Sequence, residues 1–202
     1  MCNAACMEFA NKLTKDDVEA KRVLEVGSFN VNGSMRLVAQ PLLPSEYIGV
    51  DITEGPGVDE VCDVLSLTKR FGKESFDVVI SSEMIEHVYD WRGAISNMKG
   101  VLKTGGVLLI TTRSQGFSWH CFPTDWWRYE IADMERIFDD FTIEALERDL
   151  SAPGVFVLAR KPVYFHENKL SHHALYSMIE GKRCTRFDKE KVFLMNIMEL
   201  CK

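Results

Sequence analysis

Several features are missing from this 202-residue chain, and each absence excludes a class of protein. No apolar run approaches the roughly 20 residues of a membrane span, and the amino terminus lacks the basic segment and apolar core of a secretory signal. Basic residues are not in excess, and the net charge of −6 argues against nucleic acid as the main partner, because phosphate binding requires a basic surface. We therefore expect a cytoplasmic protein without a membrane or nucleic-acid partner.

Cys-x-x-Cys pairs are also absent. The six cysteines are scattered, at Cys2, Cys6, Cys62, Cys121, Cys184 and Cys201. A disulfide framework is not expected in a chain with 46% hydrophobic residues, so they are interpreted as free thiols in a reducing compartment. Neither the Cys2 and Cys6 pair nor the three histidines between 166 and 173 has the further ligands of a metal site, so no metal is expected.

What the chain does have is an organising segment at 23–34, VLEVGSFNVNGS. It predicts a buried strand over 23–26, a turn at Gly27 and a helix over 35–39, an order typical of nucleotide-binding α/β folds. Gly27 has no Cβ and lets the backbone approach a ligand. Glu25, at the carboxyl end of an apolar strand, requires a cationic or hydroxyl-bearing partner.

Further strands and helices alternate along the chain. Strands are predicted over 47–51, 58–62, 75–81 and 107–112, and helices over 91–103, capped by Asp90, and over 131–138. The closely spaced strands at 141–150 and 155–161 predict an antiparallel hairpin at one sheet edge. Asp51 ends one of these strands and Asp63 directly follows another.

These motifs resemble the class I S-adenosylmethionine-dependent methyltransferases, of the compact, type 11-like group that acts on small molecules. Glu25 and Gly27 match the family's first motif, in which Phe29 and Val31 stand where two further glycines are usual. The most specific match is FDVVISSEMIEHV at 76–88. Over residues 20 to 162 the resemblance implies a doubly wound, Rossmann-like α/β fold with a seven-stranded sheet of order 3-2-1-4-5-7-6 and an antiparallel edge strand.

The resemblance also implies S-adenosylmethionine as the cofactor, bound across the carboxyl ends of the strands. Glu25 and the Gly27 loop would hold its methionine end, Asp51 the ribose, and Asp63 with Val64 the adenine; the alternative for Asp51 is a helix cap or surface turn. The expected cofactor-binding residues are Glu25, Gly27, Ser28, Phe29, Asn30, Asp51, Ile52, Asp63, Val64, Ser81 and Ser82.

An aromatic segment at 113–130, RSQGFSWHCFPTDWWRYE, holds three of the four tryptophans. We interpret it as the wall of a substrate pocket, with a hydrophobic plug as the alternative. The candidate catalytic residues are His87, His120 and Tyr129. An unperturbed histidine pKa near 6.5 suits proton transfer, but His87 and Glu86 can equally hold their loop in place by hydrogen bonds.

The ends of the chain are assigned more coarsely. Residues 1–21 predict two helical pieces, which either pack on the domain or form a lid over the site. The methyltransferase domain is expected to span 1–162, and 163–202 to form a C-terminal helical extension. Its apolar helix at 191–201 docks on its own domain or on a second subunit, and we favour a homodimer.

The expected function is S-adenosylmethionine-dependent methyl transfer to a small-molecule acceptor. One alternative is a non-catalytic protein of this type that binds the cofactor or a partner protein, because Phe29 and Val31 replace two glycines that are usual in the first loop. The other is a nicotinamide-dependent oxidoreductase, which the missing Gly-x-Gly-x-x-Gly and the antiparallel edge both disfavour.

Overall fold

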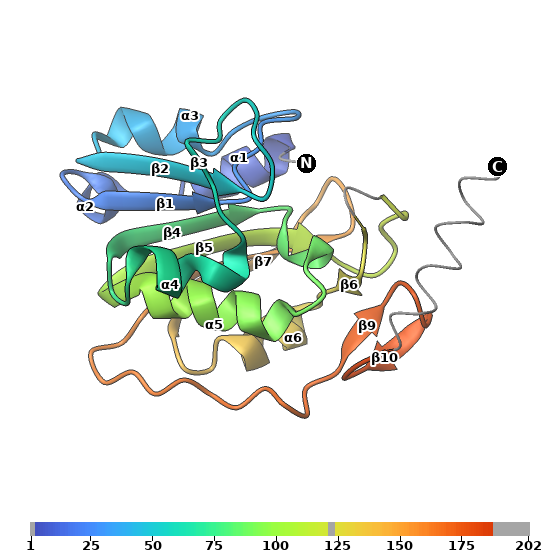
Figure 1. Ribbon diagram of the computed structural model, residues 1–202. Coiled ribbons are helices and arrows are strands. Elements are labelled where there is room, and N and C mark those ends of the chain that lie inside the picture. The colour runs from blue at the N-terminus through green and yellow to red at the C-terminus, as the bar shows by residue number, and fades with distance from the viewer. Residues whose placement is uncertain (1–2, 121–123, 188–202) are drawn as a thin grey trace.

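The computed structural model describes residues 3–120 and 124–187. Its centre is a seven-stranded sheet of order β3-β2-β1-β4-β5-β8-β7 (Figure 1). The strands are β1 (Arg22–Val26), β2 (Glu46–Asp51), β3 (Glu60–Val61), β4 (Phe76–Ser82), β5 (Leu102–Arg113), β7 (Thr142–Arg148) and β8 (Gly154–Arg160). The first five are parallel, and β8 runs antiparallel between β5 and β7. The predicted order is confirmed, because β7 and β8 are the predicted sixth and seventh strands.

Helices cover both faces of this sheet. The first face carries α1 (Ala4–Ala10), α2 (Lys15–Val18) and α3 (Arg36–Ala39), and the second carries α4 (Leu67–Phe71), α5 (Trp91–Val101) and α6 (Ile131–Ile137). Neighbouring residues of one strand face opposite sides of the sheet. Val78 packs against the hydrophobic core of the first face, and Val79 against that of the second. This burial of both faces explains why the central strands are apolar throughout.

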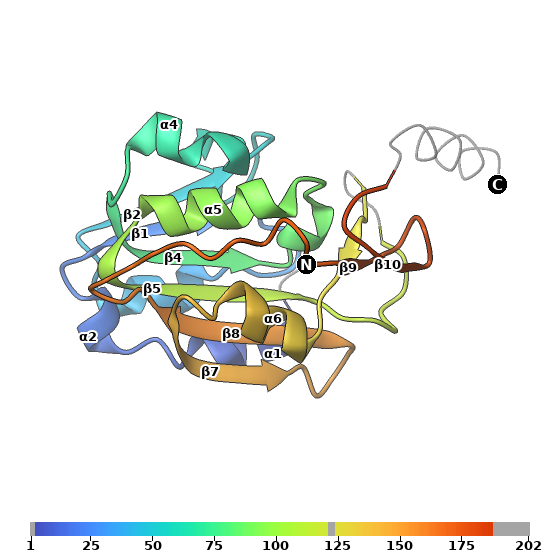
Figure 2. The same ribbon diagram turned by 90° about the horizontal axis from the view of Figure 1, so that it is seen from below.

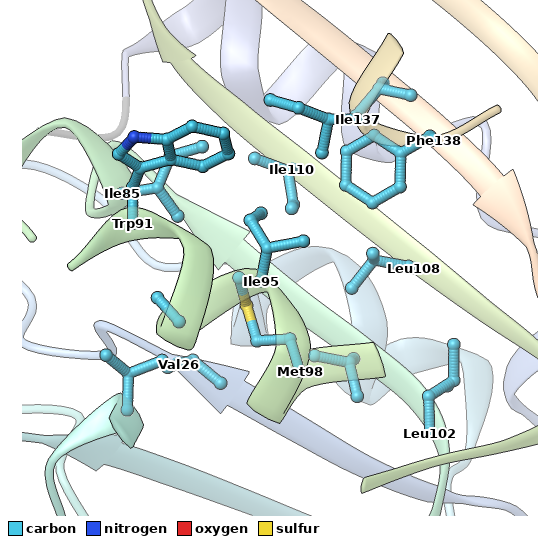
Figure 3. Packing of buried hydrophobic residues seen from close by; sticks show 14 of the residues in the cluster. Val26, Ile85, Trp91, Ile95, Met98, Leu102, Leu108, Ile110, Ile137 and Phe138 are labelled. Atoms are coloured by element: carbon cyan, nitrogen blue, oxygen red, sulfur yellow. The ribbon is translucent and has the colours of Figure 1, made fainter. Parts of the chain in front are cut away.

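The core on the second face is built around α5. Figure 3 shows Trp91, Ile95 and Met98 of this helix packed toward β5, with Ile137 and Phe138 beside them. Its first turn is capped by Asp90, whose side chain accepts a hydrogen bond from the Gly93 backbone, as predicted. The helix ends at Val101, and β5 begins directly at Leu102. Residues 102–106, between the predicted strand at 107–112 and the end of the helix, therefore belong to the strand, where Gly105 N donates to Lys161 O of the neighbouring chain segment.

The chain after β8 returns past α5 and α6 (Figure 2). It forms β9 (Leu175–Ser177) and β10 (Lys182–Cys184), which build a small antiparallel sheet with β6 (Trp127–Arg128). The described part of the expected helical extension thus contains strands, and the helix predicted at 191–201 lies outside the described residues. Among the residues described, no helix has the length and apolarity needed to cross a membrane.

Candidate functional site

A cavity of about 700 Å³ opens at the carboxyl ends of β1, β2, β3 and β4. In parallel α/β sheets this edge is where ligands bind. The predicted residues that line it are Glu25, Gly27, Ser28, Phe29, Asp51, Ile52, Asp63, Val64, Ser82, His87 and His120. Three predicted residues, Asn30, Ser81 and Tyr129, are not in its wall. Its wall also includes Met84 and Tyr89, which the sequence did not single out.

The turn after β1 requires glycine for two reasons. Gly27 has a φ of +82°, and a Cβ at this position would lie 2.6 Å from the Cβ of Met84. The Phe29 ring, which occupies the place of a usual glycine, packs against Gly55, where an added Cβ would lie 2.1 Å from the ring. Phe29 therefore forms part of the wall and leaves the cavity open. Asn30 stabilises the loop from outside the cavity, by accepting a hydrogen bond from Gly33 N.

Glu25 is 2% exposed, and its carboxylate has two partners within the protein. Oε2 accepts a hydrogen bond of 2.7 Å from the Tyr47 hydroxyl, and Oε1 accepts one of 3.3 Å from Met35 N. Burial raises the pKa of Glu25 to about 7, although both hydrogen bonds act in the opposite direction. The sequence analysis expects a cationic or hydroxyl-bearing ligand as the partner of Glu25, but the hydroxyl that contacts it belongs to the Tyr47 side chain of β2.

The two acids at the ends of β2 and β3 reach the same cavity. Asp51 accepts hydrogen bonds from Phe29 N at 3.2 Å and from Thr53 N at 3.4 Å, which connect β2 to the first loop. Asp63 accepts one of 2.9 Å from Leu65 N and caps the short helix η2 (Val64–Ser66). Both carboxylates therefore organise their own loops as well as lining the cavity.

A cluster of Glu86, His87 and His120 closes one end of the cavity. Glu86 and His87 belong to the short helix η3 (Ile85–His87), and the two imidazole rings lie 4.7 Å apart between centroids. Glu86 Oε1 is 3.9 Å from His87 Nε2 and 3.8 Å from His120 Nε2. Burial tends to raise the pKa of Glu86, but His120 and His87 outweigh it and hold the pKa at about 2.

His120 is positioned by a buried acid. Its Nδ1 lies 3.1 Å from Asp125 Oδ2, and its backbone N–H donates to the same oxygen at 3.0 Å. Burial tends to lower the pKa of His120, but Asp125 and Glu86 outweigh it and raise the pKa to about 9. Asp125 is itself held by the fully buried guanidinium of Arg128. The aromatic segment thus presents His120 to the first cavity, and the buried ion pair between Asp125 and Arg128 fixes the segment in place.

Much of the aromatic segment packs inward, as the plug alternative predicted. Trp127 is 1% exposed, donates its indole N–H to Tyr89 O, and contacts Phe187. Phe122, expected in the pocket wall, lies outside the described residues.

The expectation that Tyr129 faces the site is wrong. Its side chain is fully buried and its hydroxyl donates to Ile85 O at 3.2 Å. Pairing of Tyr129 N with Arg113 O fixes the residue against β5, and its hydroxyl supports the helix that carries His87. Ser81 is likewise fully buried within β4, so of the two serines only Ser82 lines the cavity.

A second cavity of about 550 Å³ adjoins the first and shares Gly33 and His120 with it. Asn3, Ala4 and Met7 around α1 form one wall, and Arg113 and Phe117 lie in its lining. Arg113 is held by Asp149 at 3.1 Å and by an ion pair with Glu83. Arg113, Phe117 and His120 all belong to the aromatic segment, which the sequence predicts as the wall of a substrate pocket. The sequence did not single out Arg113, the last residue of β5, or Asn3 and Met7 of the segment predicted to pack on the domain or to cover the site.

Comparisons with known proteins match this arrangement. A family model described as "Methyltransferase domain" matches residues 3–191. A ubiquinone biosynthesis O-methyltransferase from Parvibaculum lavamentivorans is 26% identical over 106 residues, which span 50% of this chain and only 42% of that protein.

Two solved structures share the fold. An S-adenosylmethionine-dependent methyltransferase from Mesorhizobium loti aligns with a TM-score of 0.61 at 19% identity, over 79% of this chain and 98% of that one. The 1,6-didemethyltoxoflavin-N1-methyltransferase of Burkholderia thailandensis, solved with 1,6-didemethyltoxoflavin and S-adenosylhomocysteine, aligns with a TM-score of 0.60 at 16% identity, over 79% of each chain.

Proposed function

Because the chain belongs to the methyltransferase domain family, we propose that it transfers a methyl group from S-adenosylmethionine to a small-molecule acceptor. S-adenosylmethionine is the cofactor, as the sequence predicts. The observation that carries the proposal is the cavity at the carboxyl ends of the parallel strands, which joins a second cavity at His120.

The residues of the first cavity fit this cofactor. A turn that excludes a Cβ at Gly27 gives the close backbone approach that its methionine end requires. Asp51 offers carboxylate oxygens that can accept hydrogen bonds from ribose hydroxyls, and Asp63 with Val64 provides a polar and an apolar contact for the adenine. The bound cofactor supplies a methyl group on a positively charged sulfur, which the acids of the wall favour electrostatically.

The second cavity is the proposed acceptor site. Met7 and Phe117 give it apolar walls that exclude water, and His120 is the residue that reaches both cavities together with Gly33. Holding the acceptor in line with the methyl group can supply much of the rate. When the acceptor atom carries a proton, His87 is the proposed base, and His120, whose pKa is raised to about 9, is a proposed positioning residue. Of the three methyltransferases named above, one was solved with 1,6-didemethyltoxoflavin and one is named for ubiquinone biosynthesis, and we infer a planar or apolar acceptor of similar size.

Calorimetric titration tests the cofactor site. We expect the wild-type protein to bind S-adenosylmethionine and S-adenosylhomocysteine with micromolar affinity, and Asp51→Ala to weaken both by about tenfold or more, because it removes charged acceptors. Asp16→Ala is the matched control, since this exposed acid lies in α2 at the first sheet face. Absence of binding by the folded wild type would overturn the proposal, and unchanged binding by Asp51→Ala would overturn the ribose assignment.

A non-catalytic binding protein is the second candidate, favoured by Phe29 and Val31 in the place of glycines. Transfer of a labelled methyl group to a panel of planar phenols and nitrogen heterocycles distinguishes the two. Cofactor binding without turnover of any panel member would favour the second candidate. The oxidoreductase alternative loses its support from the fold, because the antiparallel β8 departs from the parallel last strand that it requires.

A reducing compartment, the cytoplasm, is the proposed location, supported by Cys62 and Cys184, which form no disulfide among the described residues. The homodimer and the domain boundary at residue 162 stay predictions. Light scattering of the full chain and of a variant ending at residue 187 tests whether the last residues mediate dimerisation.

A further inference from the structure

Three potential metal ligands converge at the junction of the two cavities. Glu86 Oε1 lies 3.9 Å from His87 Nε2 and 3.8 Å from His120 Nε2, and the three ligand atoms all lie within 4.8 Å of one another. These separations are too long for hydrogen bonds. They are close to the roughly 3.4 Å between two ligands of a tetrahedral ion with bonds of about 2.1 Å.

The outer atoms of His87 and Glu86 are already hydrogen-bonded within the protein, and the outer nitrogen of His120 lies beside a carboxylate without a hydrogen bond to it. His87 Nδ1–H donates to Thr124 O at 2.9 Å, and His120 Nδ1 lies 3.1 Å from the Asp125 carboxylate. Glu86 Oε2 accepts a hydrogen bond of 2.8 Å from the Thr112 hydroxyl. Such outer contacts orient histidine and carboxylate ligands in metal sites and leave their inner atoms directed at the ion.

The inner atom of the acid has no hydrogen-bond donor among the described residues. Glu86 is fully buried, and within the described part of the chain its Oε1 makes no hydrogen bond. A buried carboxylate oxygen without a hydrogen bond is costly unless a cation or donor satisfies it. The Nε2 atoms of His87 and His120 face this oxygen but are too far from it to form hydrogen bonds. A single ion between the three atoms can contact all of them.

We propose that Glu86, His87 and His120 bind one divalent transition-metal ion, such as Zn²⁺. Two imidazoles and one carboxylate suit this class of ion, and three protein ligands leave a coordination position open. His87 and His120 line the first cavity and His120 also lines the second, so the open position faces their junction. There the ion binds an oxygen or nitrogen atom of the acceptor. This role rests on the proposed function, whereas the binding of the ion is independent of it.

The sequence analysis expects no metal, and the three ligands of this site form no recognisable motif. The histidines are 33 positions apart, at 87 and 120, and the acid directly precedes the first of them, so no regular ligand spacing exists. Only the contact between η3 and the aromatic segment brings the three together, through the hydrogen bond from Trp126 N to Glu86 O.

Zn²⁺ titration of the chelator-treated full chain tests the proposal. We expect one ion to bind per chain, with affinity reduced at least about 100-fold in His87→Ala and His120→Ala, and about tenfold in Thr112→Val, which removes only the support of Glu86. His166→Ala and His172→Ala are matched controls, since both histidines are exposed, and should bind as the wild type does. Failure of the folded wild type to bind a stoichiometric ion, or equal binding by all variants, would overturn the proposal.

A second measurement needs no variant. Zn²⁺ should protect His87 and His120 from acylation by diethylpyrocarbonate, mapped by mass spectrometry, and leave His166 and His172 reactive. Equal labelling with and without Zn²⁺ would contradict the site. S-adenosylmethionine titration of the metal-free protein is made separately, so failure of the metal site and failure of the proposed function give different results.

Discussion

The guanidinium of Arg128 and the carboxylate of Asp125 form an ion pair in which both side chains are completely excluded from solvent. Arg128 Nη2 donates to Asp125 Oδ2 at 2.6 Å and to the backbone oxygen of Ser118 at 3.1 Å. These bonds offset the cost of burying the charges and connect both ends of the loop that carries His120. The same Asp125 oxygen lies 3.1 Å from His120 Nδ1, so the Arg128 pair also sets the position of a cavity residue.

We predict that Arg128→Met lowers the free energy of unfolding by about 3–5 kcal/mol, because it leaves the Asp125 charge buried without its partner. Urea denaturation followed by tryptophan fluorescence measures the change. Arg136→Ala is the control: its pair with Asp139 is 48% and 42% exposed, and its loss should cost less than about 1 kcal/mol. Equal effects of the two substitutions would show that burial of the Arg128 pair has no energetic consequence.

A comparison of two glycines separates backbone strain from steric overlap. Gly27 and Gly72 have similar φ angles of +82° and +85°, but an added Cβ meets Met84 at 2.6 Å in the first and nothing within 4 Å in the second. We expect Gly72→Ala to cost about 1 kcal/mol of stability through strain alone and to leave S-adenosylmethionine binding unchanged.

Gly27→Ala should cost more stability than Gly72→Ala and weaken cofactor binding by at least about tenfold, because Met84 in the cavity wall must move. Thermal unfolding and calorimetric titration of the two variants measure both effects. Retention of wild-type affinity by Gly27→Ala would show that the turn after β1 does not approach the cofactor closely.

The sheet was predictable because its signals are local. Apolar runs such as that of β4 placed the strands, and the acids at or next to the ends of three of them identified Glu25, Asp51 and Asp63 at one edge. A parallel sheet brings all such strand ends together, so residues distant in sequence could be assigned to one cavity.

The aromatic segment was not predictable in the same way. Which of its side chains faces the cavity depends on β6, whose pairing with β9 comes from residues 175–177 of the distant C-terminal region. That pairing buries Trp127 and Arg128, and Tyr129 beside them. Neither composition nor spacing could therefore show that Tyr129 is buried whereas His120 lines the cavity. The convergence of Glu86 with both histidines depends on the same long-range packing.

Tyr129→Phe tests the structural role of a residue first expected in the site. Loss of the hydrogen bond to Ile85 O should lower stability by about 1 kcal/mol, since a buried acceptor loses its donor. The turnover rate for any acceptor found should change less than twofold, because the ring does not line the cavity. Unchanged stability together with a large loss of turnover would instead place the hydroxyl at the acceptor.

Glu25 gives the protein a pH dependence whose sign follows from its burial. Its pKa rises from 4.5 in the unfolded chain to about 7 in the folded protein, mainly through desolvation, so the folded state holds this proton more tightly. Raising the pH from about 4.5 to 7 therefore lowers the contribution of Glu25 to the free energy of unfolding by about 3 kcal/mol.

We predict that the Glu25→Gln variant does not lose this stability as the pH rises, because glutamine keeps the size of the side chain but does not titrate. Relative to the wild type, its free energy of unfolding should be higher at pH 8 than at pH 5, by an amount that approaches about 3 kcal/mol. Urea denaturation of both proteins at the two pH values measures the difference and cancels every other titrating group. A difference that is the same at pH 5 and pH 8 would mean that Glu25 keeps an ordinary pKa, and that Tyr47 and Met35 N stabilise its charge fully.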